Sequence, residues 1–144
     1  MLYPEIDVDE AKRRLDADPN TVFIDVRTEA EFEAGHVPNA LNIPIKIDNP
    51  ATGQRESNPD FLAVAAAAVP KDARVICGCK TGGRSGMATQ LLLRAGYRDV
   101  TNMDGGFVGK PDAAGWSEQG YPISFDAEDG RAYRSLAARA GLGR

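Results

Sequence analysis

The sequence predicts an α/β fold in which a mainly parallel sheet is flanked by helices. Apolar, β-branched segments at residues 21–26 and 74–79 are typical of strands that are buried on both faces, and residues 99–103 are a third strand candidate. Segments with helical spacing of their apolar residues separate these strands, and the connections are short. Strands that alternate with helices in this way favour a parallel sheet with right-handed crossovers.

A first helix is expected before the first of these strands, and a second helix after it. Asp7 is a candidate N-cap for the first helix, which ends at the break formed by Asp18-Pro19-Asn20. Thr28 and Glu31 have the spacing of a capping box, and Gly35 is a typical residue at a helix end. The second helix is therefore predicted between Thr28 and Gly35.

The alternation continues along the chain after one irregular segment. Residues 41–43 are a brief strand candidate, whereas residues 46–58 are rich in Asp, Asn, Pro and Gly, so we expect an exposed loop there. Asn58-Pro59 is typical of a helix start, and the alanine-rich helix that follows should end at Pro70. A further helix is expected from Ser85 onwards, between the strands at residues 74–79 and 99–103.

The length of the chain fits one ordinary domain. Its 144 residues are enough to bury a continuous core without disulfides or metal. We expect a domain at residues 1–122 and a C-terminal extension at residues 123–144. Within this extension, residues 128–140 place Tyr133 and Leu136 on one face and should form a helix.

The composition argues against two classes of partner. The formal net charge of −4 gives no basic footprint for nucleic acid. The longest uninterrupted apolar run, Phe61–Val69, is far shorter than the roughly 20 residues that cross a bilayer, and the start of the chain lacks a signal-peptide pattern. We therefore expect a cytoplasmic protein that binds neither nucleic acid nor a membrane.

The two cysteines, Cys77 and Cys79, must be explained by packing or by reactivity. A bridge between them would close too small a loop to constrain the unfolded chain. Together with His36, the only histidine, they supply three soft metal ligands at most, so no metal is expected. Cys77 lies inside a strand and is expected to pack as a small apolar residue.

Cys79 is the candidate nucleophile. It begins the loop Cys79-Lys80-Thr81-Gly82-Gly83-Arg84-Ser85, which connects a buried strand to a helix. The glycines allow backbone N–H groups to converge at the helix N-terminus, an arrangement that stabilises an anion. The helix dipole and the two cations of the loop favour the thiolate over the thiol.

Three motifs in order resemble those of the rhodanese-like domain family. The first comprises residues 25–27, 31–32 and 35–44, the second is the loop at 79–85, and the third is the segment from Asn102 to Phe107. Together they cover residues 7 to about 122. The resemblance implies a three-layer fold whose five-stranded, mainly parallel sheet has helices on both faces. Gly78 stands where this family usually has a bulkier residue, which predicts a more open pocket floor.

The resemblance also implies sulfur transfer. Cys79 would take a sulfane sulfur from a small donor such as thiosulfate, hold it as a persulfide, and pass it to a thiol, a cyanide-like acceptor or a protein, without a cofactor. The substrate-binding residues would be Lys80, Thr81, Gly82, Gly83, Arg84 and Ser85. Asp25 and Arg27 would support the loop, and Arg84 is expected to pair with a carboxylate such as Asp25.

Three other functions are compatible with parts of the sequence. A phosphatase-like or arsenate-reducing enzyme would also use a cysteine and an arginine, but its loop would have five residues between them, whereas four separate Cys79 from Arg84. A thiol redox protein could use Cys77-Gly78-Cys79, although the bridge would distort a buried strand. A noncatalytic binding module would not need the nucleophile and its glycine loop.

Overall fold

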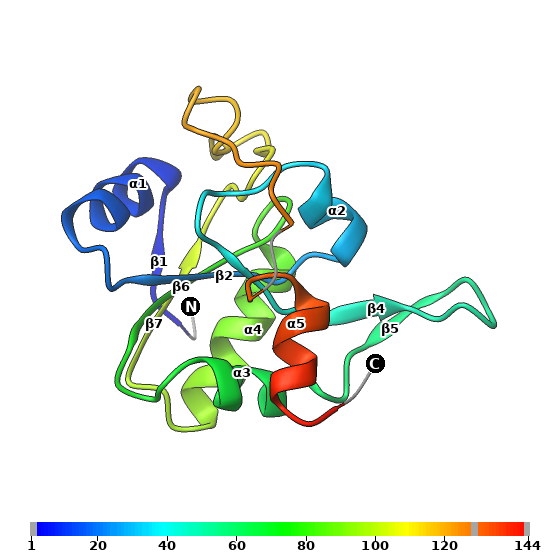
Figure 1. The fold of residues 1–144 in the computed structure, drawn as a ribbon. Coiled ribbons are helices and arrows are strands. Elements are labelled where there is room, and N and C mark those ends of the chain that lie inside the picture. Colours follow the sequence, from blue (N-terminus) through cyan, green and yellow to red (C-terminus); the bar gives the residue numbers. More distant parts are fainter. Residues whose placement is uncertain (1–2, 128–129, 143–144) are drawn as a thin grey trace.

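The computed structural model describes residues 3–127 and 130–142, and its centre is a parallel sheet of five strands (Figure 1). The strands lie in the order β1-β7-β6-β2-β3, and each neighbouring pair is parallel. Their bounds are Glu5–Ile6 for β1, Val22–Asp25 for β2, Leu41–Asn42 for β3, Arg74–Gly78 for β6 and Asp99–Met103 for β7. The α/β class and the five-stranded sheet predicted from the sequence are confirmed.

Helices cover both faces of the sheet, as Figure 1 shows. One layer contains α3, α4 and α5, and the other contains α1 and α2. Their bounds are Val8–Ala17 for α1, Glu29–Glu33 for α2, Phe61–Ala68 for α3, Gly83–Arg94 for α4 and Tyr133–Arg139 for α5. Within the described ranges, none of these helices is long and apolar enough to span a membrane.

Each face of the sheet has its own apolar cluster. Val75 and Cys77 of β6 belong to the cluster beneath α3 and α4, where Leu92 is also buried. Ile76 lies between them in the strand and belongs to the other cluster, together with Trp116. Because alternate residues of a strand point to opposite faces, a strand between two helical layers is apolar throughout.

The predicted starts of α1 and α2 are confirmed. The Asp7 carboxylate accepts a hydrogen bond from the Glu10 backbone N–H at 2.8 Å and caps α1. At α2, Thr28 and Glu31 form a capping box. The helix that follows Cys79, α4, begins at Gly83, earlier than its apolar spacing predicted.

Strand β1 was not predicted. Glu5 lies beside Asn102 in the pairing with β7, and Ile6 lies beside Met103. Two residues are too few for an alternating pattern, so the sequence gives no local signal for this strand.

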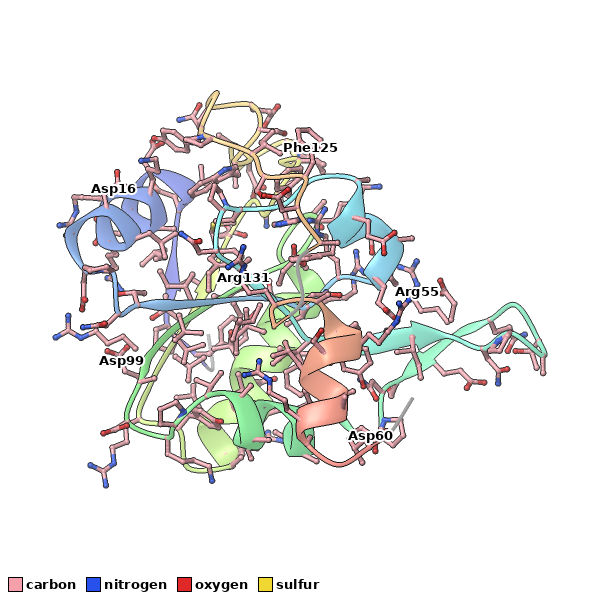
Figure 2. The ribbon with its side chains drawn as sticks, viewed as in Figure 1. Asp16, Arg55, Asp60, Asp99, Phe125 and Arg131 are labelled. Carbon is pink, nitrogen blue, oxygen red and sulfur yellow. The ribbon has the colours of Figure 1, made fainter. Side chains whose placement is uncertain are left out.

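Residues 46–58 are largely exposed, as expected, but the expectation that they form a loop without strands was wrong. Strands β4 (Lys46–Asp48) and β5 (Arg55–Ser57) pair in antiparallel fashion and form a hairpin that projects from the body (Figure 1). Arg55 lies on this hairpin (Figure 2) and pairs with Asp48 at 3.2 Å. Because the hairpin is largely exposed and polar, it lacks the alternation that would have identified its strands.

Asn58 is not the N-cap residue of α3, but its Oδ1 accepts the Asp60 backbone N–H at 3.0 Å immediately before the helix. Its side-chain amide donates to the Pro44 carbonyl at 2.9 Å and to the Tyr133 hydroxyl at 3.0 Å. Helix α3 begins after Asp60, which makes no side-chain cap bond. Asn58 also connects the end of the hairpin to α5.

Helix α5 lies within the range predicted for the C-terminal helix, of which residues 128–129 lie outside the described residues. Leu136 and Ala137 are buried in the same cluster as Val64 of α3. The last helix is therefore part of the core layer that covers one face of the sheet (Figure 1).

Candidate active site

The carboxyl ends of three neighbouring strands bring the candidate residues together. Asp25 ends β2, Cys79 follows β6, and Asp104 follows β7. Asp25 and Gly78 are register partners, so the loop that begins at Cys79 starts beside the end of β2. This is the edge at which open parallel sheets place their sites.

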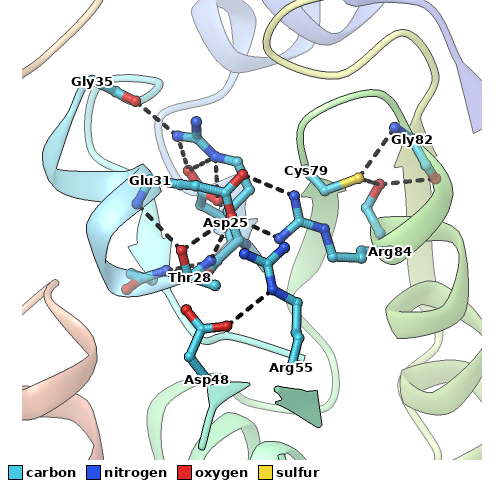
Figure 3. A network of polar contacts seen from close by, with 12 residues as sticks. Asp25, Thr28, Glu31, Gly35, Asp48, Arg55, Cys79, Gly82 and Arg84 are labelled. Carbon is cyan, nitrogen blue, oxygen red and sulfur yellow. Dashed lines mark hydrogen bonds and ion pairs between the residues drawn. The ribbon is translucent and has the colours of Figure 1, made fainter. Parts of the chain in front are cut away.

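The Cys79 sulfur lies at the base of the loop and accepts polar contacts from it (Figure 3). The residue is only 3% exposed. The Gly82 N–H donates to Sγ at 3.1 Å, and the Ser85 hydroxyl oxygen lies 3.3 Å from Sγ. Helix α4 starts at Gly83, so the positive end of its dipole is at this loop. The Gly82 N–H and the helix dipole stabilise negative charge on the sulfur.

Gly82 makes the N–H contact possible. Its φ angle is 125°, in the region that side chains with a Cβ rarely adopt. A Cβ at this position would also lie 3.2 Å from a carboxylate oxygen of Asp104. The predicted role of a loop glycine in directing an amide at the sulfur is therefore found at this residue.

The segment after β7 packs directly against the loop. The Phe107 N–H donates to the Cys79 carbonyl at 2.8 Å, and the Val108 N–H donates to the Lys80 carbonyl at 3.0 Å. Gly106 permits this approach, because a Cβ there would lie 2.6 Å from the Cys79 carbonyl oxygen. The motif from Asn102 to Phe107 thus holds the loop at residues 79–85 in place.

Arg84 pairs with a carboxylate, as expected, but this carboxylate belongs to Glu31 and not to Asp25, the example named from the sequence. The guanidinium donates to both carboxylate oxygens of Glu31, at 2.7 and 2.9 Å (Figure 3). The hydrogen bonds from Arg84 lower the pKa of Glu31 to about 2, and the carboxylate in turn raises the pKa of Arg84. Helices α2 and α4 are joined by this pair across the edge of the sheet.

Asp25 forms an ion pair with Arg27, and both residues are buried. Arg27 donates to the two Asp25 carboxylate oxygens at 3.0 and 2.7 Å, and to the Gly35 carbonyl at 2.7 Å. The Arg27 guanidinium also lies 4.6 Å from the centre of the Phe107 ring. Because Phe107 is bonded to the Cys79 carbonyl, this ion pair is connected to the active-site loop.

The remaining predicted site residues differ in exposure. Ser85 is buried, whereas Lys80, Thr81 and Gly83 are exposed. The charge of Lys80 therefore faces solvent, where it can act on an approaching anion.

Cys77 is a packing residue, and Gly78 does not open the pocket floor. Cys77 is fully buried, and this burial raises the pKa of its thiol to about 12. At Gly78, the Phe23 ring fills the space that a Cβ would need. The expectation of a more open floor was wrong, because a neighbouring strand supplies the missing bulk.

The sequence analysis did not identify the site roles of three polar residues, Glu5, Glu31 and Asn102. Glu31 was assigned only to a helix cap. Asn102 accepts from the Ser85 hydroxyl at 2.5 Å and donates to the Glu5 carboxylate at 2.9 Å. Asn102 lies within a quoted motif, but no sequence signal pointed to its partner on the short strand β1.

Known proteins resemble this chain in sequence and fold. A family model described as Rhodanese-like domain matches residues 7–109. Thiosulfate sulfurtransferase 18 of Arabidopsis thaliana is 33% identical over 126 residues, which are 86% of this chain and 85% of that protein.

Two further comparisons extend the likeness. The mitochondrial protein HIGH ARSENIC CONTENT 1 of Arabidopsis thaliana is 44% identical over 93 residues, 63% of this chain and 53% of that protein. The crystal structure of Rv0390 from M. tuberculosis aligns with a TM-score of 0.71 and 28% identity, covering 88% of this chain and 100% of that one.

Proposed function

Because this chain belongs to the rhodanese-like domain family, we propose that it is a sulfurtransferase that carries a sulfane sulfur as a persulfide on Cys79. The observation that carries this proposal is the surrounding of the Cys79 sulfur. Gly82 donates a backbone N–H at 3.1 Å, the Ser85 hydroxyl lies at 3.3 Å, and α4 begins beside them. Such a site favours an anionic sulfur.

Sulfur transfer would proceed in two displacement steps. In the loading step, the Cys79 thiolate attacks the outer sulfur of thiosulfate. The sulfur–sulfur bond of the donor breaks, and sulfite leaves with its electron pair. In the discharge step, an acceptor such as cyanide attacks the terminal sulfur of the persulfide, which gives thiocyanate and restores the thiolate.

The surface charge near the loop fits an anionic donor. Lys80 is exposed immediately after the nucleophile, so its ammonium can attract thiosulfate without holding the loop. A protein acceptor would have to bring a thiol to a cysteine that is only 3% exposed.

Two alternative functions lose support from the geometry. A phosphatase-like or arsenate-reducing enzyme would use its arginine to bind the substrate oxyanion. Here the Arg84 guanidinium donates to both carboxylate oxygens of Glu31 instead. A thiol redox protein would need a disulfide between Cys77 and Cys79. Cys77 is poorly suited to thiol–disulfide exchange, because it is buried and the pKa of its thiol is raised.

An intact mass spectrum after exposure to thiosulfate tests the proposal. We expect wild type to gain the mass of one sulfur atom and to lose it on treatment with cyanide. Cys79→Ser should gain nothing, whereas Cys77→Ala, the matched control, should load like wild type.

The opposite result would identify a different enzyme. The proposal fails if wild type gains no sulfur from thiosulfate or polysulfide while it hydrolyses a phosphate ester or reduces arsenate. Equal abolition of loading in a folded Cys77→Ala protein would instead support a dithiol mechanism.

A further inference from the structure

The Ser85 hydroxyl has one proton and three acceptors within reach. Its oxygen lies 2.5 Å from Asn102 Oδ1, 3.2 Å from the Gly82 carbonyl oxygen and 3.3 Å from Cys79 Sγ. Ser85 and Asn102 are both fully buried, at 0% exposure. The hydroxyl can satisfy one of these acceptors fully at a time.

The Asn102 side chain is oriented by a residue on the neighbouring strand. Its Nδ2 donates to Glu5 Oε2 at 2.9 Å and to the Gly82 carbonyl at 3.3 Å. Both partners are acceptors, so the amide nitrogen must face them and Oδ1 must face Ser85. Because Oδ1 cannot donate, the Ser85 proton points at Asn102, and a Ser85 lone pair faces the sulfur.

This arrangement suits one charge state of Cys79 and opposes the other. A lone pair opposite Sγ is compatible with a thiol or with the bridging sulfur of a persulfide, neither of which carries the negative charge. A thiolate at 3.3 Å would instead attract the hydroxyl proton, because hydrogen bonds to ionised acceptors are the stronger ones.

We propose that the Ser85 hydroxyl changes its hydrogen-bond partner with the charge on Cys79 Sγ, and that Asn102, oriented by Glu5, is its acceptor while Sγ is bonded. This inference rests on the proposed sulfur transfer and names positioning residues for it. No proton is transferred. The hydroxyl rotates toward Sγ when the sulfur–sulfur bond breaks and its electron pair returns to Sγ, and it rotates back to Asn102 when that bond forms.

The two partners of Ser85 would then favour opposite steps. Donation to Sγ stabilises the leaving thiolate during discharge, and it lowers the nucleophilicity of the thiolate during loading. Asn102 withdraws the proton as the persulfide forms and so favours loading. Removing the donor or the acceptor should displace the equilibrium between thiolate and persulfide in opposite directions.

The test measures this equilibrium with thiosulfate and sulfite, together with single-turnover rates of loading and of cyanide discharge. In Ser85→Ala we expect discharge to slow about tenfold, loading to be unimpaired, and the equilibrium to shift toward persulfide. In Asn102→Leu we expect loading to slow about tenfold and the equilibrium to shift toward the thiolate.

Variants of Glu5 provide the control, and they remain usable if a buried substitution prevents folding. Glu5→Gln keeps an acceptor for the Asn102 amide and should behave like wild type. Glu5→Leu removes the acceptor from this half-buried position and should shift the equilibrium in the same direction as Asn102→Leu.

The proposal is overturned if the buried variants shift the equilibrium in the same direction or leave it unchanged, or if Glu5→Leu matches Glu5→Gln. A purely structural role would slow both steps together. Failure of wild type to form a persulfide would contradict the proposed function instead, so the two failures are distinguishable.

Discussion

Cys77 and Cys79 are two positions apart in the sequence, yet their surroundings differ in kind. Cys77 is fully buried between the sheet and α4, and desolvation raises the pKa of its thiol to about 12. Cys79 lies one residue beyond the end of β6, and the Gly82 N–H donates to its sulfur. We therefore expect Cys79 to be the reactive cysteine, because it lies just after the end of β6, where loop groups can contact its sulfur.

Iodoacetamide should label Cys79 and leave Cys77 unmodified in the folded protein at neutral pH. At that pH almost none of the Cys77 thiol is ionised, and the thiolate is the form that reacts. Peptide mapping by mass spectrometry over a time course gives the two rates. Labelling of both cysteines at similar rates, before unfolding, would contradict this account.

Replacing Lys80 by Glu should raise the KM for thiosulfate several-fold at low salt and change kcat little. The exposed ammonium attracts the anionic donor, and this attraction is screened as ionic strength rises. Arg98→Glu changes the charge equally at an exposed position before β7, at the opposite edge of the sheet. An equal rise in KM in both variants, or a difference that persists in high salt, would count against a local role for Lys80.

Helices α2 and α4 come from distant parts of the chain, and Glu31 and Arg84 join them. Glu31 has two tasks, because one of its oxygens also accepts the Thr28 N–H in the capping box at 3.1 Å. Arg84 thus pairs with a carboxylate as predicted, but with Glu31 and not with Asp25, the example named from the sequence. The strand end is supported separately, through Arg27 and the Phe107 ring.

Glu31→Gln should lower the free energy of unfolding by about 1 kcal/mol at pH 7, since glutamine can keep the cap but loses the ion pair. Because the folded-state pKa of Glu31 is lowered from 4.5 to about 2, the stabilisation is fully present above about pH 5 and is lost as the pH falls toward 2. Urea unfolding across this range measures the difference. Glu29→Gln, on the same helix turn, is the control and should show a smaller pH-dependent difference.

At the scale of the whole molecule, α5 lies outside the family match but packs in the same layer as α3 and α4, which lie within it. The family model matches residues 7–109, whereas Leu136 of α5 is 1% exposed in the cluster that contains Cys79. The domain boundary at residue 122 stays a prediction. The cytoplasmic location also stays a prediction, because one relative of this chain is named as a mitochondrial protein.

Leu136→Ala should lower the free energy of unfolding by about 2–5 kcal/mol, because it leaves a cavity in a buried cluster. Denaturant unfolding measures the loss. Leu62→Ala, at a position of α3 that is 39% exposed, is the matched control and should cost much less. Equal costs would mean that α5 contributes no more to the core than a surface side chain.

The sequence by itself determined the features that depend on local chemistry. Apolar runs predicted strands β2 and β6, β7 was identified as the next strand in the alternation with helices, and capping residues predicted the starts of α1 and α2. The order of three motifs indicated the family, and the loop from Cys79 to Ser85 indicated the nucleophile. These features are predictable because the spacing of apolar residues, the preferences for helix caps and the composition of loops depend on residues that are close in the chain.

Only the tertiary structure decided the contacts between distant segments. It assigned Glu31 to Arg84, filled the space at Gly78 with Phe23, and placed Glu5 and Asn102 behind Ser85. It also paired the polar hairpin strands β4 and β5, which lack an apolar alternation. A residue type fixes what a side chain can bind, but strand order and register decide which partner comes within reach.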